Sequence, residues 1–375
     1  DYLAEAQQKV AEQDWAGAKV AYTQYIVQYP KKPEGYEGRG IANYQLGKHD
    51  AALEDLNQAV SFRSYSADVF YYRGLLQYQN QDYRQAILDL NKAIKEGTKQ
   101  ADAYYTRGNA YFRNESYAEA IQDYNQAISL GQADELVFNN RGKAKLYQND
   151  YPGAVEDFTQ AVTVKESYVK GWSNLGEAQY QLKQWESAIK SYKKAASLGE
   201  SSQDITFQIA MAYRELGQYE AALQAFKQAE KEGLSGSELN YYRGITAFSA
   251  EKYSESVRDL EKIVSAQEAQ WLTDELYHYL GLAYHQLNRS AKATAILEKI
   301  EPENRKVEDW MALGSSYFAQ KKYQKAVEAL LPAKAESEIA HLLGKAYIYL
   351  NQPQDGMPFL TKAIEVGSEE AELYH

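Results

Sequence analysis

The feature that most constrains this chain is a recurrence of similar residues every 34 positions. Residues 101–134 are the clearest copy, with Gly108, Ala120 and Tyr124 at fixed offsets. Small residues recur at the Gly108 offset at Ala6, Gly40, Gly74, Gly142, Gly176, Ala210, Gly244, Gly281, Gly314 and Gly344. The last three intervals change to 37, 33 and 30 residues. A period of this length is typical of repeat architectures, in which each unit stacks on its neighbours.

Each repeat reads as two helices when position 1 is set seven residues before the small residue. Apolar residues in 101–134 follow an i, i+3, i+4, i+7 spacing in two stretches, which predicts amphipathic helices at about positions 2–14 and 16–29. The small residues at positions 8 and 20 let the paired helices approach closely. Glycines at position 31 are expected to end helices in a left-handed cap, at Gly97, Gly131, Gly199, Gly233 and Gly367.

Five of the eleven repeats carry arginine at position 7, and the same five carry aspartate at position 23. The pairs are Arg39 and Asp55, Arg73 and Asp89, Arg107 and Asp123, Arg141 and Asp157, and Arg243 and Asp259. The other six repeats have neither residue. This coincidence predicts an ion pair between the two helices of one repeat, and replacing Asp123 should destabilise the array about as much as replacing Arg107.

The composition excludes several classes of function. With 41 basic and 52 acidic residues the net charge is −11, which argues against nucleic acid or an anionic membrane as the main partner. No apolar run is long enough to span a membrane. The chain has no cysteine, which rules out disulfides, thiolate metal sites and cysteine nucleophiles.

No group of residues suggests catalysis. His278 and His285 are seven residues apart on one predicted helix, too far apart for a two-histidine metal site, and are interpreted as polar surface residues. The glycines follow the structural period, so none forms a phosphate-binding loop. We therefore expect a non-enzymatic protein without cofactor or metal.

The repeated residues resemble the tetratricopeptide repeat family. The family has an aromatic residue at position 4, Leu-Gly at 7–8, Tyr at 11, and Ala, an aromatic residue or Leu, and Ala at 20, 24 and 27. The matching residues in 101–134 are Tyr104, Gly108, Tyr111, Ala120, Tyr124 and Ala127. The resemblance covers about eleven tandem repeats and implies an all-α, right-handed solenoid of antiparallel helix pairs, with the first helices lining the concave face.

The resemblance also implies that positions 2, 5, 6, 9, 12 and 13 face the groove. Most of that lining is aromatic and apolar, as at Tyr71, which packing between repeats would equally explain. Repeats four to six differ, because amides and cations replace the aromatic residues there. The candidate peptide-binding residues are Tyr71, Tyr105, Asn109, Arg113, Asn139, Asn140, Lys143, Lys170, Asn174 and Gln208.

Two patterns within this set point to a peptide. Asn109, Asn140 and Lys170 match part of the family's carboxylate clamp, whereas Tyr105 and Asn174 stand where that clamp has basic residues. Asn140, Asn174 and Gln208 also form a row of amides at position 6. Amides offer donors and acceptors to a peptide backbone, and Lys or Arg attract a carboxylate.

We therefore predict a protein-interaction scaffold that holds an extended peptide or a partner helix at repeats four to six. A structural spacer in an envelope or secretion assembly, and the recognition arm of a larger enzyme, remain alternatives.

We expect residues 1–375 to form one solenoid, with regular repeats over 1–270, degenerate repeats over 271–370 and a further helix beginning at 371–375. Both ends of the array look uncapped, which leaves self-association open. The start at Asp1, the acidic balance and the lack of cysteine favour a bacterial extracytoplasmic protein, including a lipoprotein, over a cytoplasmic one.

Overall fold

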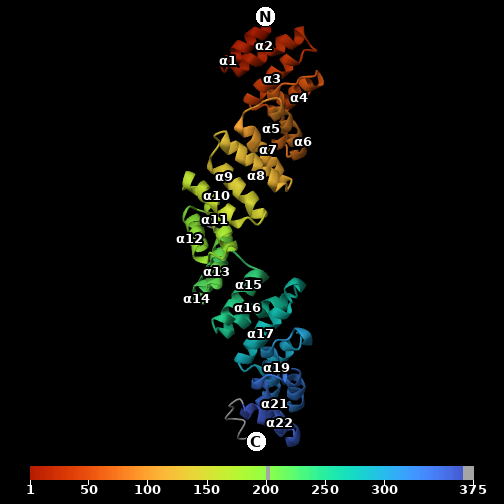
Figure 1. The fold of residues 1–375 in the computed structure, drawn as a ribbon, viewed down its shortest axis with the longest axis vertical. Helices are drawn as coiled ribbons and strands as arrows, with labels where there is room; N and C mark the ends of the chain where they lie inside the picture. The colour runs from red at the N-terminus through yellow and green to blue at the C-terminus, as the bar shows by residue number, and fades with distance from the viewer. Residues whose placement is uncertain (200–202, 366–375) are drawn as a thin grey trace. The chain divides into compact units, whose positions relative to one another are not determined.

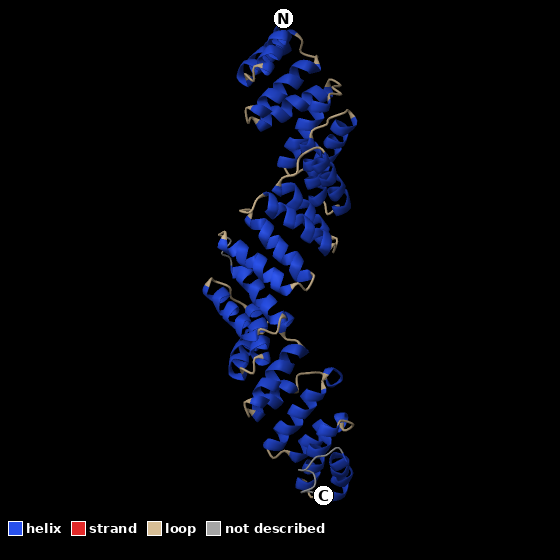
Figure 2. Cartoon of the chain, turned by 60° about the vertical axis from the view of Figure 1, so that its left-hand side comes forward, coloured by secondary structure: helices blue, strands red, loops and turns tan. Residues whose placement is uncertain are grey.

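A computed structural model describes residues 1–199 and 203–365, which form helices joined by short turns (Figure 2). The chain divides into two compact units, Asp1–Gly199 and Glu200–His375. The expected single solenoid over residues 1–375 therefore stays a prediction, as do its boundaries. The expected helix at 371–375 and the cap at Gly367 lie outside the described residues.

The first unit consists of six consecutive helix pairs (Figure 1). They are α1 (Tyr2–Ala11) and α2 (Trp15–Gln28), α3 (Pro33–Gln45) and α4 (His49–Ser61), α5 (Ala67–Gln79) and α6 (Tyr83–Lys95), α7 (Ala101–Arg113) and α8 (Tyr117–Ser129), α9 (Glu135–Tyr147) and α10 (Tyr151–Val164), and α11 (Val169–Gln181) and α12 (Trp185–Ser197). In α7 and α8 the helices occupy positions 1–13 and 17–29, close to the predicted ranges.

The described part of the second unit contains five further pairs. They are α13 (Gln203–Glu215) and α14 (Tyr219–Lys231), α15 (Ser237–Ser249) and α16 (Tyr253–Ala266), α17 (Asp274–Gln286) and α18 (Ser290–Leu297), α19 (Val307–Ala319) and α20 (Tyr323–Leu330), and α21 (Ser337–Tyr349) and α22 (Pro353–Glu365). Short 3-10 turns follow α16, α18 and α20, at Ala269–Trp271, Pro302–Asn304 and Leu331–Ala333. The predicted all-α fold of antiparallel helix pairs is confirmed.

The small residues at positions 8 and 20 are where the two helices of a pair meet. A Cβ atom added to Gly108 would lie 3.0 Å from Cε1 of Tyr124, and 3.2 Å from Cβ of Asp123. Ala120, at position 20, is completely buried. Larger side chains at these positions would push the helices apart, because well-packed interiors have no spare volume.

The predicted ion pair within each of the five repeats is confirmed. Nε and Nη2 of Arg107 donate to the two carboxylate oxygens of Asp123 at 2.7 and 2.6 Å. The same two-bond contact joins Arg39 to Asp55, Arg73 to Asp89, Arg141 to Asp157, and Arg243 to Asp259. Nη1 of Arg107 also donates to Asn91 of the preceding repeat, at 2.6 Å, a contact that was not predicted. One arginine therefore joins two helices of its own repeat and a third from its neighbour.

The turns of the repeat use left-handed backbone at two places. The expected caps at position 31 are confirmed at Gly97, Gly131, Gly199 and Gly233, whose φ angles are +102°, +98°, +105° and +112°. The structure adds a second left-handed residue at position 15, between the two helices of every repeat. Most of these residues are not glycine, as at Glu115 with a φ of +60°, so glycine alone does not mark this turn.

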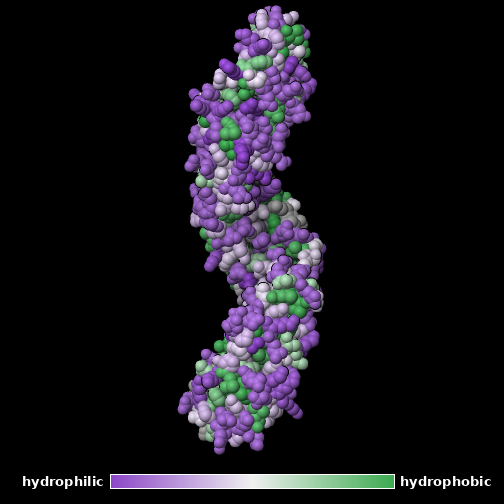
Figure 3. Space-filling model, turned by 90° about the vertical axis from the view of Figure 1, so that its right-hand side faces the viewer, coloured by the Kyte–Doolittle hydropathy of each residue, from purple (hydrophilic) through white to green (hydrophobic). Residues whose placement is uncertain are grey.

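Within each unit, the first helices of successive repeats touch one another, as α7 does with both α5 and α9. Each helix packs most extensively against its partner in the pair. On the face shown in Figure 3, hydrophilic residues dominate and hydrophobic ones occur in small scattered patches. Among the described residues, no helix combines the length and the apolar character that crossing a bilayer requires.

Candidate functional site

A cavity of about 210 Å³ opens on the first helices of repeats three to five, within the first unit. The helices α5, α7 and α9 supply most of its walls, and α8 contributes one tyrosine. The lining residues are Tyr78, Tyr105, Asn109, Phe112, Arg113, Tyr124, Asn140 and Lys143. Five of these eight are among the residues that the sequence analysis selected, so helix packing brings them together.

Hydrogen bonds fix the amides of the cavity in place. The amide nitrogen of Asn140 donates to the hydroxyl of Tyr105 at 3.1 Å and to Oδ1 of Asn109 at 3.0 Å. The hydroxyl of Tyr124 donates to the same Oδ1 of Asn109 at 2.8 Å. Because two donors meet this oxygen, the side chain of Asn109 is held in one orientation, with its NH₂ group directed away from them.

The network continues into repeat six through a buried amide. Asn174 donates to Oδ1 of Asn139 at 2.8 Å, and Asn139 donates to Oδ1 of Asn140 at 3.3 Å. Asn139 is only 4% exposed. It can therefore orient Asn140 and Asn174 but offers almost no surface to a ligand.

Three cations lie close together at this site. Burial lowers the pKa of Lys143, and the nearby charges of Arg113 and Lys170 lower it further. The ammonium group of Lys143 stands 5.5 Å from the ring centre of Phe112. Among the described residues, no carboxylate forms an ion pair with any of these three cations. The cluster therefore attracts an anion.

The tyrosines of the cavity remain neutral hydrogen-bonding groups. Burial raises the pKa of Tyr105, and it also raises the pKa of Tyr124. Because phenols titrate near pH 10 even when exposed, both hydroxyls stay protonated at physiological pH. They add donors and acceptors to the cavity without adding negative charge.

Two further candidate residues are not among those that line the cavity. Tyr71 is 5% exposed, and its hydroxyl donates to Asp102 of the next repeat at 3.1 Å, so it packs between first helices. Gln208 belongs to α13 in the second unit and is half-buried. The structure thus joins Asn140 and Asn174 in one network, and a role for Gln208 in the amide row stays a prediction.

Phe112 and Tyr124 line the cavity but were not predicted from the sequence. Tyr124 was interpreted as a packing residue at position 24, yet its hydroxyl reaches Asn109 at position 9 of the same repeat. Tyr192 and Glu177 occupy the same two positions in repeat six and are also bonded, at 3.2 Å. A tyrosine at position 24 with a polar residue at position 9 was the signal available in the sequence.

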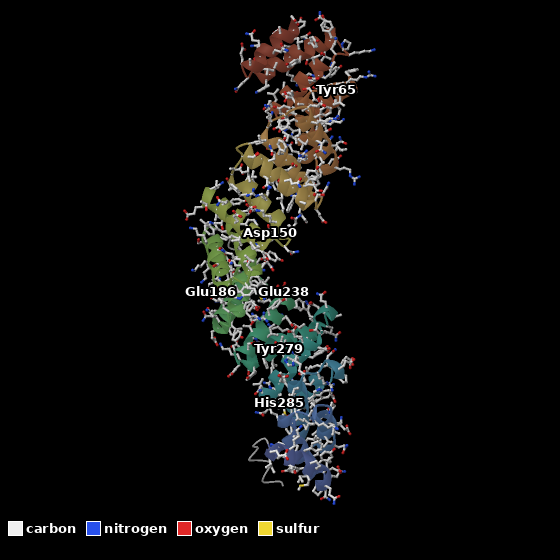
Figure 4. All side chains as sticks on the ribbon, in the orientation of Figure 1. Tyr65, Asp150, Glu186, Glu238, Tyr279 and His285 are labelled. Carbon is white, nitrogen blue, oxygen red and sulfur yellow. The ribbon has the colours of Figure 1, made fainter. Side chains whose placement is uncertain are left out.

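The interpretation of His278 as a surface residue is wrong. Its side chain is 10% exposed, and its Nδ1 lies 2.8 Å from Oδ1 of Asp309 on α19. His285, labelled on α17 in Figure 4, is half-buried with its Nδ1 3.1 Å from the hydroxyl of Ser316, and burial lowers its pKa. Both histidines face α19, the first helix of the next repeat, and side chains of that helix cover them. Across residues 1–199 and 203–365, no group of three or more His, Cys, Asp or Glu side chains is arranged to hold a metal ion.

Comparison with solved structures finds several similar proteins. YrrB, described as a TPR protein with an unusual peptide-binding site, is 18% identical, with 48% of this chain and 93% of that chain covered and a TM-score of 0.45. The C-terminal part of a TPR repeat-containing protein from Cytophaga hutchinsonii is 20% identical, covering 63% and 97%, with a TM-score of 0.49. PilF of Pseudomonas aeruginosa is 17% identical, covering 56% and 96%, with a TM-score of 0.45. No curated protein sequence matches the chain.

Family comparison assigns the repeats directly. Residues 101–132, 139–204, 207–271 and 307–330 match families described as Tetratricopeptide repeat, and residues 40–81 match one described as TPR repeat. These matches fall on helix pairs of both units. The protein belongs to the tetratricopeptide repeat family.

Proposed function

We propose that this protein is a non-catalytic scaffold that holds an extended, anionic segment of a partner protein at repeats four to six. Tetratricopeptide repeats typically mediate protein–protein interaction, and this supports a protein partner. The acidic net charge of −11 makes nucleic acid a poor alternative, because phosphate backbones bind through basic surfaces.

The cavity with its unpaired cations is the observation that carries the proposal. The volume of about 210 Å³ is several times the volume that one molecule occupies in liquid water, roughly 30 Å³, so the cavity can admit a side chain. Arg113 and Lys143 both line it. A carboxylate placed there forms charge-assisted hydrogen bonds, which are stronger than those between neutral groups.

The amide network supplies the second half of the proposed recognition. Asn109 and Asn140 are held by each other and by two tyrosine hydroxyls, so they lose little freedom when a ligand binds. Their remaining amide groups match the alternating donors and acceptors of an extended backbone. Asn174, held through Asn139, extends the same surface toward repeat six.

Binding of matched peptides tests this function. The probes are fluorescein-labelled 12-residue peptides of Gly and Ser with one central Asp, compared with the same peptides carrying Asn. Lys143→Gln should weaken binding of the Asp peptide roughly tenfold or more, since a hydrogen bond to a charged group contributes about 1.5–3 kcal/mol. The Asn peptide should bind weakly to both proteins.

Lys345→Gln is the matched control. Lys345 occupies the same position of repeat eleven and also stands over a phenylalanine, Phe318, at 5.7 Å. Its replacement removes one positive charge but should leave affinity unchanged. Equal binding of Asp and Asn peptides to the unaltered protein would refute the proposal, as would an equal effect of the two lysine changes.

A further inference from the structure

An exposed aromatic surface lies next to the cavity. The rings of Tyr117 and Tyr147 are nearly parallel, with 7° between their planes and 5.1 Å between their centres. Phe112 meets both at a steep angle, with its centre 5.4 Å from Tyr117 and 5.7 Å from Tyr147. Tyr147 is 58% exposed. We call these three residues the aromatic shelf.

The shelf and the cavity share a wall. Phe112 belongs to both, and Lys143, which lines the cavity, stands over the ring of Phe112. Because Tyr117 stacks on one face of Tyr147, the large exposed fraction of Tyr147 belongs to its other face and its edges. A ligand that reaches Lys143 therefore passes beside an open aromatic ring.

The spacing along α9 fits an extended peptide. Lys143 and Tyr147 are four residues apart in one helix, which places them about 6 Å apart along its axis. An extended chain advances about 3.3 Å per residue, and residues i and i+2 point to the same side. Two residues of such a chain thus cover the distance from the cavity to the shelf.

We propose that the site recognises a two-part motif: an acidic residue whose carboxylate enters the cavity, and an aromatic residue two positions away whose ring stacks on Tyr147. The inference rests on the proposed function, since the acidic residue occupies the same cavity. An aromatic ring is the partner that gains most from this surface, because stacked rings contribute beyond the area they bury.

The chain contains a natural control for the shelf. A similar cluster occurs in the second unit at Phe318, Tyr323 and Tyr349, with 33° between the planes of the two tyrosine rings. Tyr349 is 50% exposed, much like Tyr147. The position of Arg113, however, is occupied there by Ala319. Tyr349 therefore offers an equally exposed ring without the arginine of the proposed anion site.

The test uses labelled 12-residue Gly/Ser peptides with the central sequences Asp-Ser-Phe, Phe-Ser-Asp, Asp-Ser-Leu and Leu-Ser-Asp. One of the two Phe peptides should bind about tenfold more tightly than its Leu counterpart. Tyr147→Ala should remove that advantage and leave the Leu peptides unaffected. Tyr147→Leu keeps an apolar side chain over Tyr117 and is the second variant in case Tyr147→Ala does not fold; it should also remove the advantage of the Phe peptide. Tyr349→Ala should leave the affinities of all four peptides unchanged.

The outcomes separate this inference from the function on which it rests. Suppose the four peptides bind and Lys143→Gln weakens their binding, but the Phe peptides bind no more tightly than the Leu peptides. The motif is then wrong and the anionic site stands. A preference for Phe that survives in Tyr147→Ala and Tyr147→Leu also overturns the motif. If none of the four peptides binds, both the motif and the proposed function fail.

Discussion

Replacing one member of the Arg107–Asp123 pair leaves the other without its charged partner in a largely buried position. The side chains are 16% and 6% exposed. Burial raises the pKa of Asp123, and Arg107 offsets this only in part. Asp123→Ala leaves the guanidinium with Asn91 as its remaining side-chain hydrogen-bond partner, and Arg107→Leu leaves a buried carboxylate unpaired. Breaking a buried pair in this way costs about 3–5 kcal/mol of unfolding free energy.

Removing both charges should cost much less. The double variant Arg107→Leu/Asp123→Ala reproduces what repeat ten has naturally at the same two positions, Leu313 and Ala329. No charge remains to be desolvated, and the main loss is the hydrogen bond from Arg107 to Asn91, about 1 kcal/mol. The double variant is therefore expected to be more stable than either single variant.

Urea unfolding of the full chain, followed by circular dichroism, measures these differences. Because a chain with two compact units need not unfold in one two-state transition, hydrogen exchange of α7 and α8 locates the effect in repeat four. Both single variants should lose protection there, and the double variant should regain most of it. Additive losses, or single variants as stable as the unaltered protein, would refute the argument that desolvation governs this pair.

Two further predictions concern the turn and the cavity. Glu115→Gly should stabilise the protein by about 0.5 kcal/mol in urea unfolding, because a left-handed backbone is strained in glutamate but not in glycine. Gly47 has a φ of +70° in the equivalent turn, so Gly47→Ala should destabilise the protein by about 1 kcal/mol. Stability changes of the opposite sign in these two variants would contradict the argument from backbone strain. Affinity for the Asp peptide should fall as pH rises through the lowered pKa of Lys143, at a pH below the ordinary lysine value of 10.5, since the carboxylate needs the charged ammonium. Lys143→Arg should lose this pH dependence in anisotropy titrations, because arginine stays charged.

Much of the fold was predictable because it depends on relations within one repeat. The spacing of apolar residues defines the helices, and the small residues at positions 8 and 20 decide which faces meet. The Arg107–Asp123 contact was predictable for the same reason, since both residues belong to one helix pair and occur together in five repeats. Its extension to Asn91 was missed because that contact crosses into the preceding repeat.

The sequence by itself determined the helices, their pairing and the set of residues from which a groove could be built. Only the tertiary structure decided which of them reach solvent: Tyr71 and Asn139 are buried, whereas Tyr105 and Asn140 line the cavity. The physical reason is that exposure at these positions depends on side chains about 30 residues away in the next repeat. Tyr71 is covered where it bonds to Asp102 of that repeat, as Tyr241 is by Glu275, and a contact between two repeats does not follow from relations within one repeat.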